Sequence, residues 1–218
     1  MTRTEIIEVL CERLRVNRQH LEEAKNAGLA VAQHADWPWY GVVVSMSTLG
    51  GADRWKDTVQ PIYDSTLSWS TLQRVKHDEE ILLSRFRKVG RYKNKTALYL
   101  LAIFRHFDNM GGPHQVQAHL SGMSVGKVLK FWCQFKGFGK KYSRNIMMDI
   151  YDPRFRNGYF AIDSRIQALL PLLGYQGRRN YEHQEAYLNE FLPDLAVESW
   201  ELDRLLFKDY EYLKQRLS

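Results

Sequence analysis

The stretch "FKGFGKKYSRN", residues 135–145, combines two glycines with two adjacent lysines and lies between two segments of helical periodicity. Glycines in a tight turn let the backbone adopt positive φ and let a ligand approach closely. Such a turn leads into a helix N-terminus, where unpaired N–H groups bind anions, phosphate above all. Lys140 adds a positive charge at the same place. The stretch therefore predicts two helices joined by a phosphate-binding turn.

Helical periodicity extends along most of the chain outside this turn. We expect helices within 5–25 (with Ile7, Leu10, Cys11 and Leu14 as one stripe), at 78–86, from Thr96 to Phe107, after Ser124, around Ile146, after Asp163 as far as Leu173, at 182–192 and at 200–215. The β-branched segment 42–48, "VVVSMST", has strand propensity but no partner strand nearby, so we interpret it as a buried helix. The sequence thus predicts an all-α fold of about ten helices.

The composition indicates a soluble protein with an anionic partner. The chain has 218 residues, 44% of them hydrophobic, a net charge of +6, and no glycine- or proline-rich segment. The excess of basic residues favours nucleic acid as partner, although a merely basic soluble protein has the same charge. No apolar run is long enough to cross a membrane, and residues 1–16 lack the apolar core of a signal peptide. We therefore expect a cytoplasmic protein, associated with the nucleoid if it is bacterial.

The cysteines and histidines do not have the spacing of a metal site. Cys11 and Cys133 lie in apolar helical patterns without a CxxC pair, so we predict two free buried thiols. Two cysteines cannot hold an iron–sulfur cluster that needs four. No HxxxH or HxH pair occurs among His34, His77, His106, His114, His119 and His183, so no transition metal is expected.

Three segments together resemble the helix-hairpin-helix DNA glycosylase superfamily, which includes endonuclease III and the 8-oxoguanine DNA glycosylases. The pattern Gly137-x-Gly139-x-Lys141, followed by "AIDSRI" at 161–166, is similar to the family's L-P-G-V-G-x-K hairpin and its V-D-T-H-V segment. "VGRYKNKTALYL" at 89–100 resembles the family's G-L-Y-x-x-K-A segment, and "MSTLGGADRW" at 46–55 its L-S-A-Q-x-T-D loop. The resemblance covers roughly residues 37–215.

The sequence also departs from the family pattern. Phe135-Lys136 replaces Leu-Pro at the start of the hairpin, and Ser164-Arg165 replaces Thr-His after the aspartate. The interval between Lys141 and Asp163 is slightly longer than in the endonuclease III type, and the iron–sulfur cysteines are absent. Because of these last two differences, the sequence resembles the 8-oxoguanine glycosylases more than endonuclease III.

The resemblance implies an architecture for the whole chain. Residues 1–218 would form a single compact unit of two helical lobes, with a DNA-binding cleft between them. One lobe, 37–151, would end in the hairpin, and the other would combine 1–36 with 152–218. The partner would be double-stranded DNA with a damaged base, and a monomer is the default for an enzyme that scans DNA.

The resemblance also implies catalytic roles for Lys141 and Asp163. The family's lysine attacks the anomeric carbon of the damaged nucleotide, displaces the base and forms a Schiff base that permits strand cleavage. A neutral amine is needed, and the helix dipole together with Lys140 would lower the pKa of Lys141. The matching Asp163 would stabilise the positively charged sugar, although its position before a helix also fits a plain N-cap. The expected function is a bifunctional glycosylase and abasic-site lyase.

Further residues follow from the same resemblance. Phe135, Gly137, Gly139 and Lys140 would contact DNA, and Leu49 is either the wedge that fills the gap left by a flipped base or a core leucine. Trp37, Trp39 and Trp55 could stack on a base, but core positions are favoured for them. Family hairpins also hold Na⁺ or K⁺ with backbone carbonyls, which would be those of Cys133, Phe135 and Phe138; no other cofactor is expected.

Two other interpretations stay open. The same fold could act on another lesion, such as an oxidised pyrimidine, because pocket residues come from several helices and have no local pattern. A hairpin protein could instead bind DNA without catalysis, but such a protein would not need the pair of Lys141 and Asp163. A helical scaffold for protein partners would not bind DNA in a salt-dependent manner.

Overall fold

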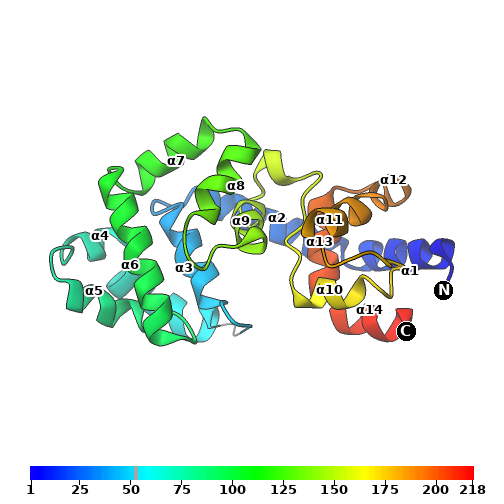
Figure 1. Cartoon of the computed structure of the whole chain (residues 1–218), viewed down its shortest axis with the longest axis horizontal. Helices are drawn as coiled ribbons and strands as arrows, with labels where there is room; N and C mark the ends of the chain where they lie inside the picture. Colours follow the sequence, from blue (N-terminus) through cyan, green and yellow to red (C-terminus); the bar gives the residue numbers. More distant parts are fainter. Residues whose placement is uncertain (52–53) are drawn as a thin grey trace. The chain divides into compact units, whose positions relative to one another are not determined.

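Contacts within the chain divide it into two units, which are described separately. The structure is a computed structural model that describes residues 1–51 and 54–218. One unit contains residues 1–29 and 147–218, and the other contains residues 30–146. Figure 1 shows helices throughout, and no strand occurs among the described residues, so the predicted all-α class is confirmed. The lobe borders implied by the family resemblance stay a prediction.

The 30–146 unit, hereafter the hairpin unit, is built around α3 and α6. Its α-helices are α3 (Trp39–Ser47), α4 (Trp69–Gln73), α5 (Glu79–Phe86), α6 (Lys93–Asn109), α7 (Pro113–Ser121), α8 (Val125–Cys133) and the start of α9 (Lys140–Met148). Between α3 and α4 lie three short turns of π or 3₁₀ helix, Trp55–Val59, Gln60–Ile62 and Tyr63–Leu67. The second unit, hereafter the terminal unit, contains α1 (Arg3–Val16), most of α2 (Arg18–Ala32), a 3₁₀ turn at Pro153–Phe155, α10 (Ser164–Leu169), α11 (Tyr181–Asn189), α12 (Leu192–Leu195), α13 (Ser199–Lys208) and α14 (Tyr210–Leu217).

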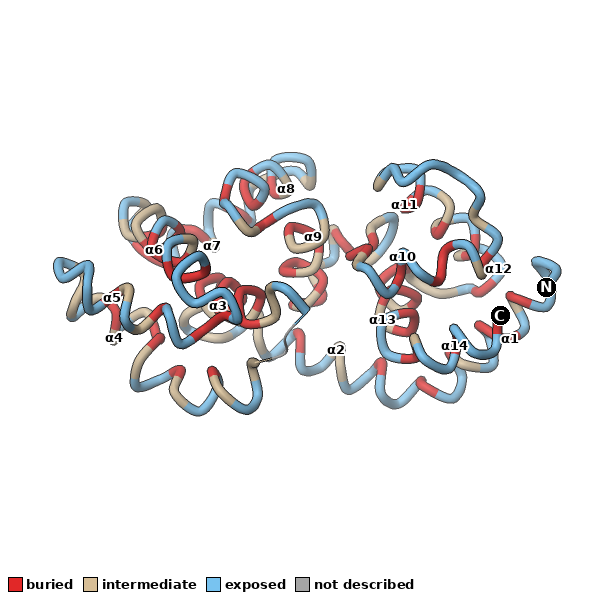
Figure 2. The backbone as a smooth tube through the Cα atoms, turned by 60° about the horizontal axis from the view of Figure 1, so that its bottom comes forward, coloured by how far each residue is buried: buried red, intermediate tan, exposed pale blue. Residues whose placement is uncertain are grey.

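The segment 42–48 is helical because it is buried on several sides. Val42, Val43 and Met46 are almost fully buried in α3. Burial in the core therefore outweighs the strand propensity of the β-branched valines. Trp39, at the start of α3, is fully buried, and its Nε1 donates to the Leu67 carbonyl at 2.8 Å. The preference for a buried helix here is therefore confirmed. Figure 2 shows how buried positions concentrate on this helix.

The predicted apolar stripe of α6 is also confirmed, and aromatic rings complete the core. Leu100, Phe104 and Phe107 are fully buried. Phe104 and Phe107 lie with their ring centroids 5.9 and 6.2 Å from Trp39. Trp37 and Trp39 are core residues, as favoured from the sequence, whereas Trp55 is only half-buried against Tyr40.

Local signals missed the helices α4 and α7 and misjudged the extent of others. Gly111 and Gly112 adopt positive φ and end α6, but Pro113 immediately starts α7, a helix not expected from the sequence. The helix after Asp163 ends at Leu169 rather than Leu173, although Leu170 and Leu173 are still buried. The expected 200–215 helix is two helices, α13 and α14, separated at Asp209.

Both cysteines are free, but the prediction that they are buried is wrong. Cys11 and Cys133 are exposed. On α1 the buried stripe is formed by Ile6, Val9, Leu10 and Leu14, so Cys11 lies just past its edge. Cys133 is the last residue of α8, where the chain turns outward into the hairpin.

Asp209 lies between α13 and α14 and is hydrogen-bonded to residues at the end of α1. Its Oδ2 accepts a hydrogen bond from Arg13 Nε at 2.7 Å and one from Asn17 Nδ2 at 2.8 Å, and the residue is buried. The hydrogen bond to Asp209 raises the pKa of Arg13. Asp209→Asn removes the charge but keeps one acceptor, so we expect the free energy of unfolding to fall by about 1 kcal/mol. Urea unfolding followed by circular dichroism measures this, with the exposed Glu12→Gln as a control that should leave stability unchanged.

Candidate nucleic-acid interface

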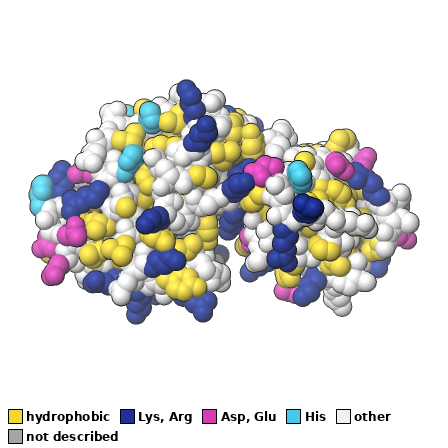
Figure 3. Space-filling model, in the orientation of Figure 1, with side chains coloured by type: hydrophobic (Ala, Val, Ile, Leu, Met, Phe, Trp, Pro, Cys, Tyr) yellow, Lys and Arg dark blue, Asp and Glu magenta, His cyan; other side chains and the backbone are white. Residues whose placement is uncertain are grey.

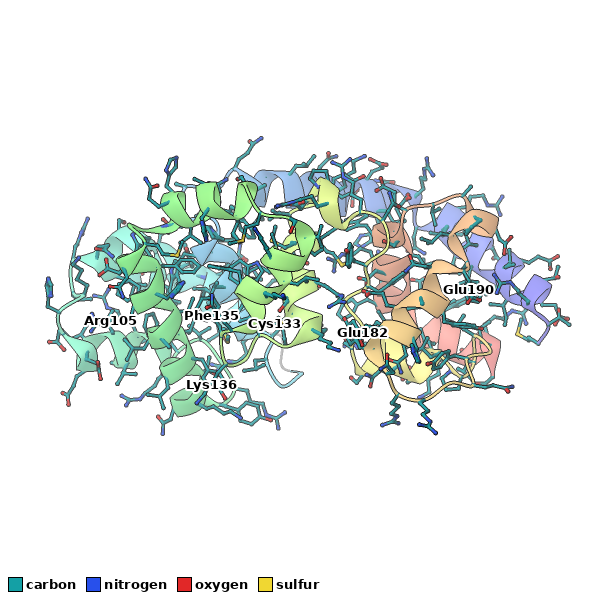
Figure 4. The ribbon with its side chains drawn as sticks, turned by 45° about the horizontal axis from the view of Figure 1, so that its top comes forward. Arg105, Cys133, Phe135, Lys136, Glu182 and Glu190 are labelled. Carbon is teal, nitrogen blue, oxygen red and sulfur yellow. The ribbon has the colours of Figure 1, made fainter. Side chains whose placement is uncertain are left out.

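A tight turn joins α8 to α9. Phe135 N donates to the Trp132 carbonyl at 3.2 Å, and Phe138 N donates to the Phe135 carbonyl at 3.0 Å, which closes the turn. The rings of Trp132 and Phe138 stack with centroids 5.4 Å apart and anchor both ends of the turn. Figure 4 labels Cys133, Phe135 and Lys136 where the chain leaves α8.

The two glycines of the turn have different roles. Gly137 has φ of +97°, and a Cβ at this position would lie 2.7 Å from Met46 Cε and 3.0 Å from Tyr99 Cδ2. Gly139 is not among the residues with positive φ, and a Cβ there would meet nothing within 4 Å. Gly137 therefore allows the turn to form and to pack closely against α3 and α6, whereas the absence of a side chain at Gly139 leaves open space at the start of α9.

Ser143 holds the first turn of α9 against the end of α8. Its backbone N and its Oγ both donate to the Gly139 carbonyl, at 3.0 and 2.9 Å. Cys133 Sγ lies 3.1 Å from the Ser143 Oγ. Because the hydroxyl hydrogen is directed to Gly139, the thiol donates to the hydroxyl. This chain of hydrogen bonds gives the exposed Cys133 a structural role.

Three segments that are far apart in the sequence meet beside this turn. Tyr142 OH donates to the Thr48 carbonyl at 3.2 Å, which joins α9 to the end of α3. Arg91 Nη1 donates to the Gly50 carbonyl at 3.3 Å, and Arg54 Nη1 donates to the Gly90 carbonyl at 3.0 Å. Within the hairpin unit, the structure thus brings together the parts of 46–55, 89–100 and 135–145 that it describes; residues 52–53 of the first segment lie outside the described part. We call the surface formed by 48–51, 89–95 and 134–142 the hairpin face.

The hairpin face is rich in exposed basic and aromatic side chains. Its exposed residues include Arg91, Tyr92, Lys93, Lys95, Lys136 and Lys140. Figure 3 shows that Lys and Arg side chains are spread over the visible face of each unit. On the hairpin face, however, they surround the start of two helices, α6 and α9, whose first turns carry positive partial charge. Such a surface attracts a polyanion.

Leu49 lies on this face, next to the hairpin. Its backbone N donates to the Met46 carbonyl at 3.4 Å, and the residue is half-exposed. Phe135, in contrast, is buried against His106 and Phe131. A contact of Phe135 with DNA is therefore expected to involve its backbone rather than its ring.

Lys141 is the second residue of α9 and is half-buried. Its Nζ lies 4.3 Å from the centroid of the Tyr142 ring. A cation above an aromatic face is stabilised, so the contact with Tyr142 favours the ammonium form of Lys141. The positive end of the helix dipole has the opposite effect. The ring is held in place by the hydrogen bond from Tyr142 to Thr48, so the amine lies over a fixed platform on the hairpin face.

Asp163 caps α10 in the terminal unit, as the sequence predicts. Its Oδ1 accepts from Arg165 N at 2.9 Å and from Ile166 N at 3.1 Å. Capping uses one carboxylate oxygen, and Asp163 itself is half-exposed. The proximity of Asp163 to Lys141 stays a prediction.

The backbone leading to Asp163 depends on residues that the sequence analysis missed. Glu185 on α11 and Asp203 on α13 are both buried, and their carboxylates accept the N–H groups of Phe160 and Ala161. One signal in the sequence could have indicated Asp203, namely an acidic residue on the apolar face of a helix. Its neighbours Leu202, Leu205 and Leu206 are buried as well.

Of the three carbonyls suggested for an alkali ion, that of Phe135 takes part in the turn. The Phe135 carbonyl already accepts one hydrogen bond, from Phe138 N, but a carbonyl oxygen has a second lone pair. No group of three or more His, Cys, Asp or Glu residues able to hold a metal occurs within 1–51 and 54–218. The alkali ion at Cys133, Phe135 and Phe138 stays a prediction.

Comparison with known proteins gives one informative similarity. No family model matches the chain, and no curated protein matches it. Among solved structures, the crystal structure of the 8-oxoguanine DNA glycosylase from Methanocaldococcus jannaschii resembles the chain with a TM-score of 0.66 and 14% sequence identity. The match covers 94% of this chain and 92% of that chain. At such low identity the likeness shows the fold, which is the all-α fold of that glycosylase.

Proposed function

We propose that the chain is a DNA glycosylase with abasic-site lyase activity, which excises a damaged base in base excision repair. The observation that carries the proposal is the hairpin face, where the three segments with family-like sequence meet around Lys141. The fold likeness to an 8-oxoguanine DNA glycosylase supports the same class and makes 8-oxoguanine the first candidate lesion. The partner is duplex DNA.

The binding step uses the start of α9. Its unpaired N–H groups and the open space beside Gly139 suit a DNA phosphate, and the exposed lysines of the hairpin face add sequence-independent attraction. Leu49, which is half-exposed on the hairpin face, would fill the stack after the damaged nucleotide leaves it, at an unstacking cost of about 2–4 kcal/mol. In the part of the chain that the structure describes, no helix has the length and apolar character to span a bilayer.

The chemical step uses the Lys141 amine as nucleophile. Its nitrogen forms a bond to the anomeric carbon, the bond from that carbon to the base breaks, and the departing base takes up a proton. Opening of the sugar ring then gives the Schiff base, and loss of a neighbouring C–H proton expels the 3′ phosphate. Asp163, at the start of α10, stabilises the positive charge that develops on the sugar.

Borohydride trapping tests the proposal directly. We expect wild-type protein, incubated with borohydride and a duplex that contains 8-oxoguanine or an abasic site, to form a covalent adduct that migrates above the free oligonucleotide. A panel of duplexes with oxidised pyrimidines identifies the lesion if 8-oxoguanine is not excised.

The outcomes separate the alternatives. Trapping with the abasic duplex and excision of another lesion would retain the enzyme class but change the substrate. Salt-dependent DNA binding without excision or trapping on any duplex would overturn the catalytic proposal and leave a DNA-binding hairpin protein.

A further inference from the structure

The segment that precedes Asp163 is extended but belongs to no sheet. In residues 159–162 of the terminal unit, each backbone N–H donates to a side-chain oxygen rather than to another backbone. The four acceptors are Ser199 Oγ at 3.3 Å, Glu185 Oε1 at 2.9 Å, Asp203 Oδ1 at 2.7 Å and Tyr181 OH at 3.0 Å. Tyr181 OH also donates to the Phe160 carbonyl at 2.7 Å. The backbone leading to Asp163 is therefore fixed by side chains of α11 and α13.

Asp203 is the more deeply buried of the two carboxylates among these acceptors. It is 1% exposed, and its hydrogen bond to Ala161 is the shortest of the four. Arg204 Nη1 lies 3.8 Å from Asp203 Oδ2, and Arg204 Nη2 donates to Asp149 at 3.0 Å. Asp203 thus shares the Arg204 guanidinium with a second carboxylate.

This environment is unfavourable for a charge. The pKa of Asp203 is raised to about 6. Burial is the main cause and Asp149 and Asp163 act in the same direction, whereas Arg204 and the Ala161 N–H oppose the rise. Because this folded-state pKa is above the ordinary aspartate pKa of 3.8, the stability contributed by Asp203 is present below pH 3.8 and is lost as the pH rises through 6. Near neutral pH the charged carboxylate of Asp203 therefore lowers the stability of the fold. A residue whose role is only structural would not be expected to have this effect.

We propose that Asp203 is a positioning residue for the reaction proposed above, whose charged carboxylate holds the Ala161 amide and so fixes the backbone that presents Asp163. A charge-assisted hydrogen bond at 2.7 Å is stronger than a neutral one, so loss of the charge loosens this segment. The inference rests on the proposed function, since positioning has meaning only if Asp163 acts on a substrate.

Asp203→Asn tests the inference, with Asp209→Asn as a matched control at the end of the same helix. The asparagine keeps an acceptor for Ala161 but loses the charge. We expect single-turnover base excision at pH 7.5 to fall about tenfold or more, because small misplacements of reacting groups have such effects. The urea midpoint should be unchanged or higher at this pH. Asp209→Asn should show the opposite pattern, with a lower midpoint and wild-type excision.

A pH profile provides a readout that a structural role would not change. The wild-type excision rate should fall as the pH decreases through about 6, and this ionisation should be absent from the profile of Asp203→Asn. In wild-type protein the NMR shift of the Ala161 amide proton should titrate over the same pH range, a measurement that needs neither a variant nor activity.

The possible results distinguish the positioning role of Asp203 from the proposed function. If wild-type protein excises a base but Asp203→Asn excises it equally fast, the positioning role is wrong and the proposed function stands. A variant that loses stability and activity in parallel would also overturn positioning. If the Ala161 amide titrates but wild-type protein neither excises nor traps on any duplex, the proposed function fails, and positioning fails with it.

Discussion

Lys141→Gln is expected to abolish the borohydride adduct and to reduce base excision by roughly a thousandfold or more, the scale on which enzymes lose activity when a catalytic nucleophile is removed. Glutamine keeps a long polar side chain but has no amine that can form a Schiff base. The measurement is single-turnover excision together with trapping on an abasic duplex. Because Lys141 is only half-buried on the first turn of α9, whereas Ile146 on the same helix is fully buried, the variant should fold normally.

Lys140→Gln is the matched control for this variant. It removes the same charge from the same helix turn, but Lys140 is exposed and adjacent to the proposed nucleophile rather than at its position. We expect it to retain trapping and to weaken DNA binding by a few-fold, about 2–5, with a smaller salt dependence. Equal trapping by Lys141→Gln and wild-type protein would exclude Lys141 as the nucleophile, and loss of trapping only in Lys140→Gln would assign that role to its neighbour.

Much of the fold could be predicted from the sequence because its signals are local. The apolar stripe of α6, the glycine-containing turn of the hairpin and the capping position of Asp163 each depend on residues within a few positions of one another. Helical periodicity and capping preferences describe such short-range patterns well. The class of the fold and the position of the hairpin followed from them.

Features that depend on distant residues could not be predicted in this way. The sequence places Arg54 and Gly90 far apart, and only the packing of α3 and α6 brings them into hydrogen-bond contact. The burial of Cys11 was predicted wrongly because periodicity alone does not locate the edge of a buried stripe. Asp203 was missed because a charged residue in an apolar helix face has meaning only once its partner, the Ala161 amide, is known.

Gly137→Ala is expected to lower the stability of the hairpin unit by about 3 kcal/mol, the largest stability effect predicted for the protein. One part of this cost is conformational, since φ of +97° is strained for any residue with a Cβ. The other part is steric, since the new Cβ would approach Met46 and Tyr99. The flexible end of Met46 can shift, but Tyr99 lies 3.0 Å away on α6 and has less freedom.

Tryptophan fluorescence during urea unfolding measures this effect in the relevant unit. Of the six tryptophans, Trp200 alone lies in the terminal unit, and Trp37, Trp39, Trp55, Trp69 and Trp132 lie in the hairpin unit. The fluorescence change therefore reports mainly on the hairpin unit. An unfolding midpoint equal to that of wild-type protein would contradict the assignment of a strained, closely packed turn to Gly137.

Gly139→Ala separates the folding role of the turn from its role in binding. Gly139 does not need positive φ, and its Cβ would meet no atom within 4 Å, so stability should change by no more than about 0.5 kcal/mol. The methyl group would, however, occupy the open space at the start of α9, where the proposed phosphate approaches the backbone N–H groups. We expect duplex affinity, measured by fluorescence anisotropy at fixed salt, to fall several-fold while the urea midpoint is retained. Wild-type affinity in Gly139→Ala would mean that DNA does not approach α9 at this residue, and the phosphate-binding site would then have to lie elsewhere on the hairpin face.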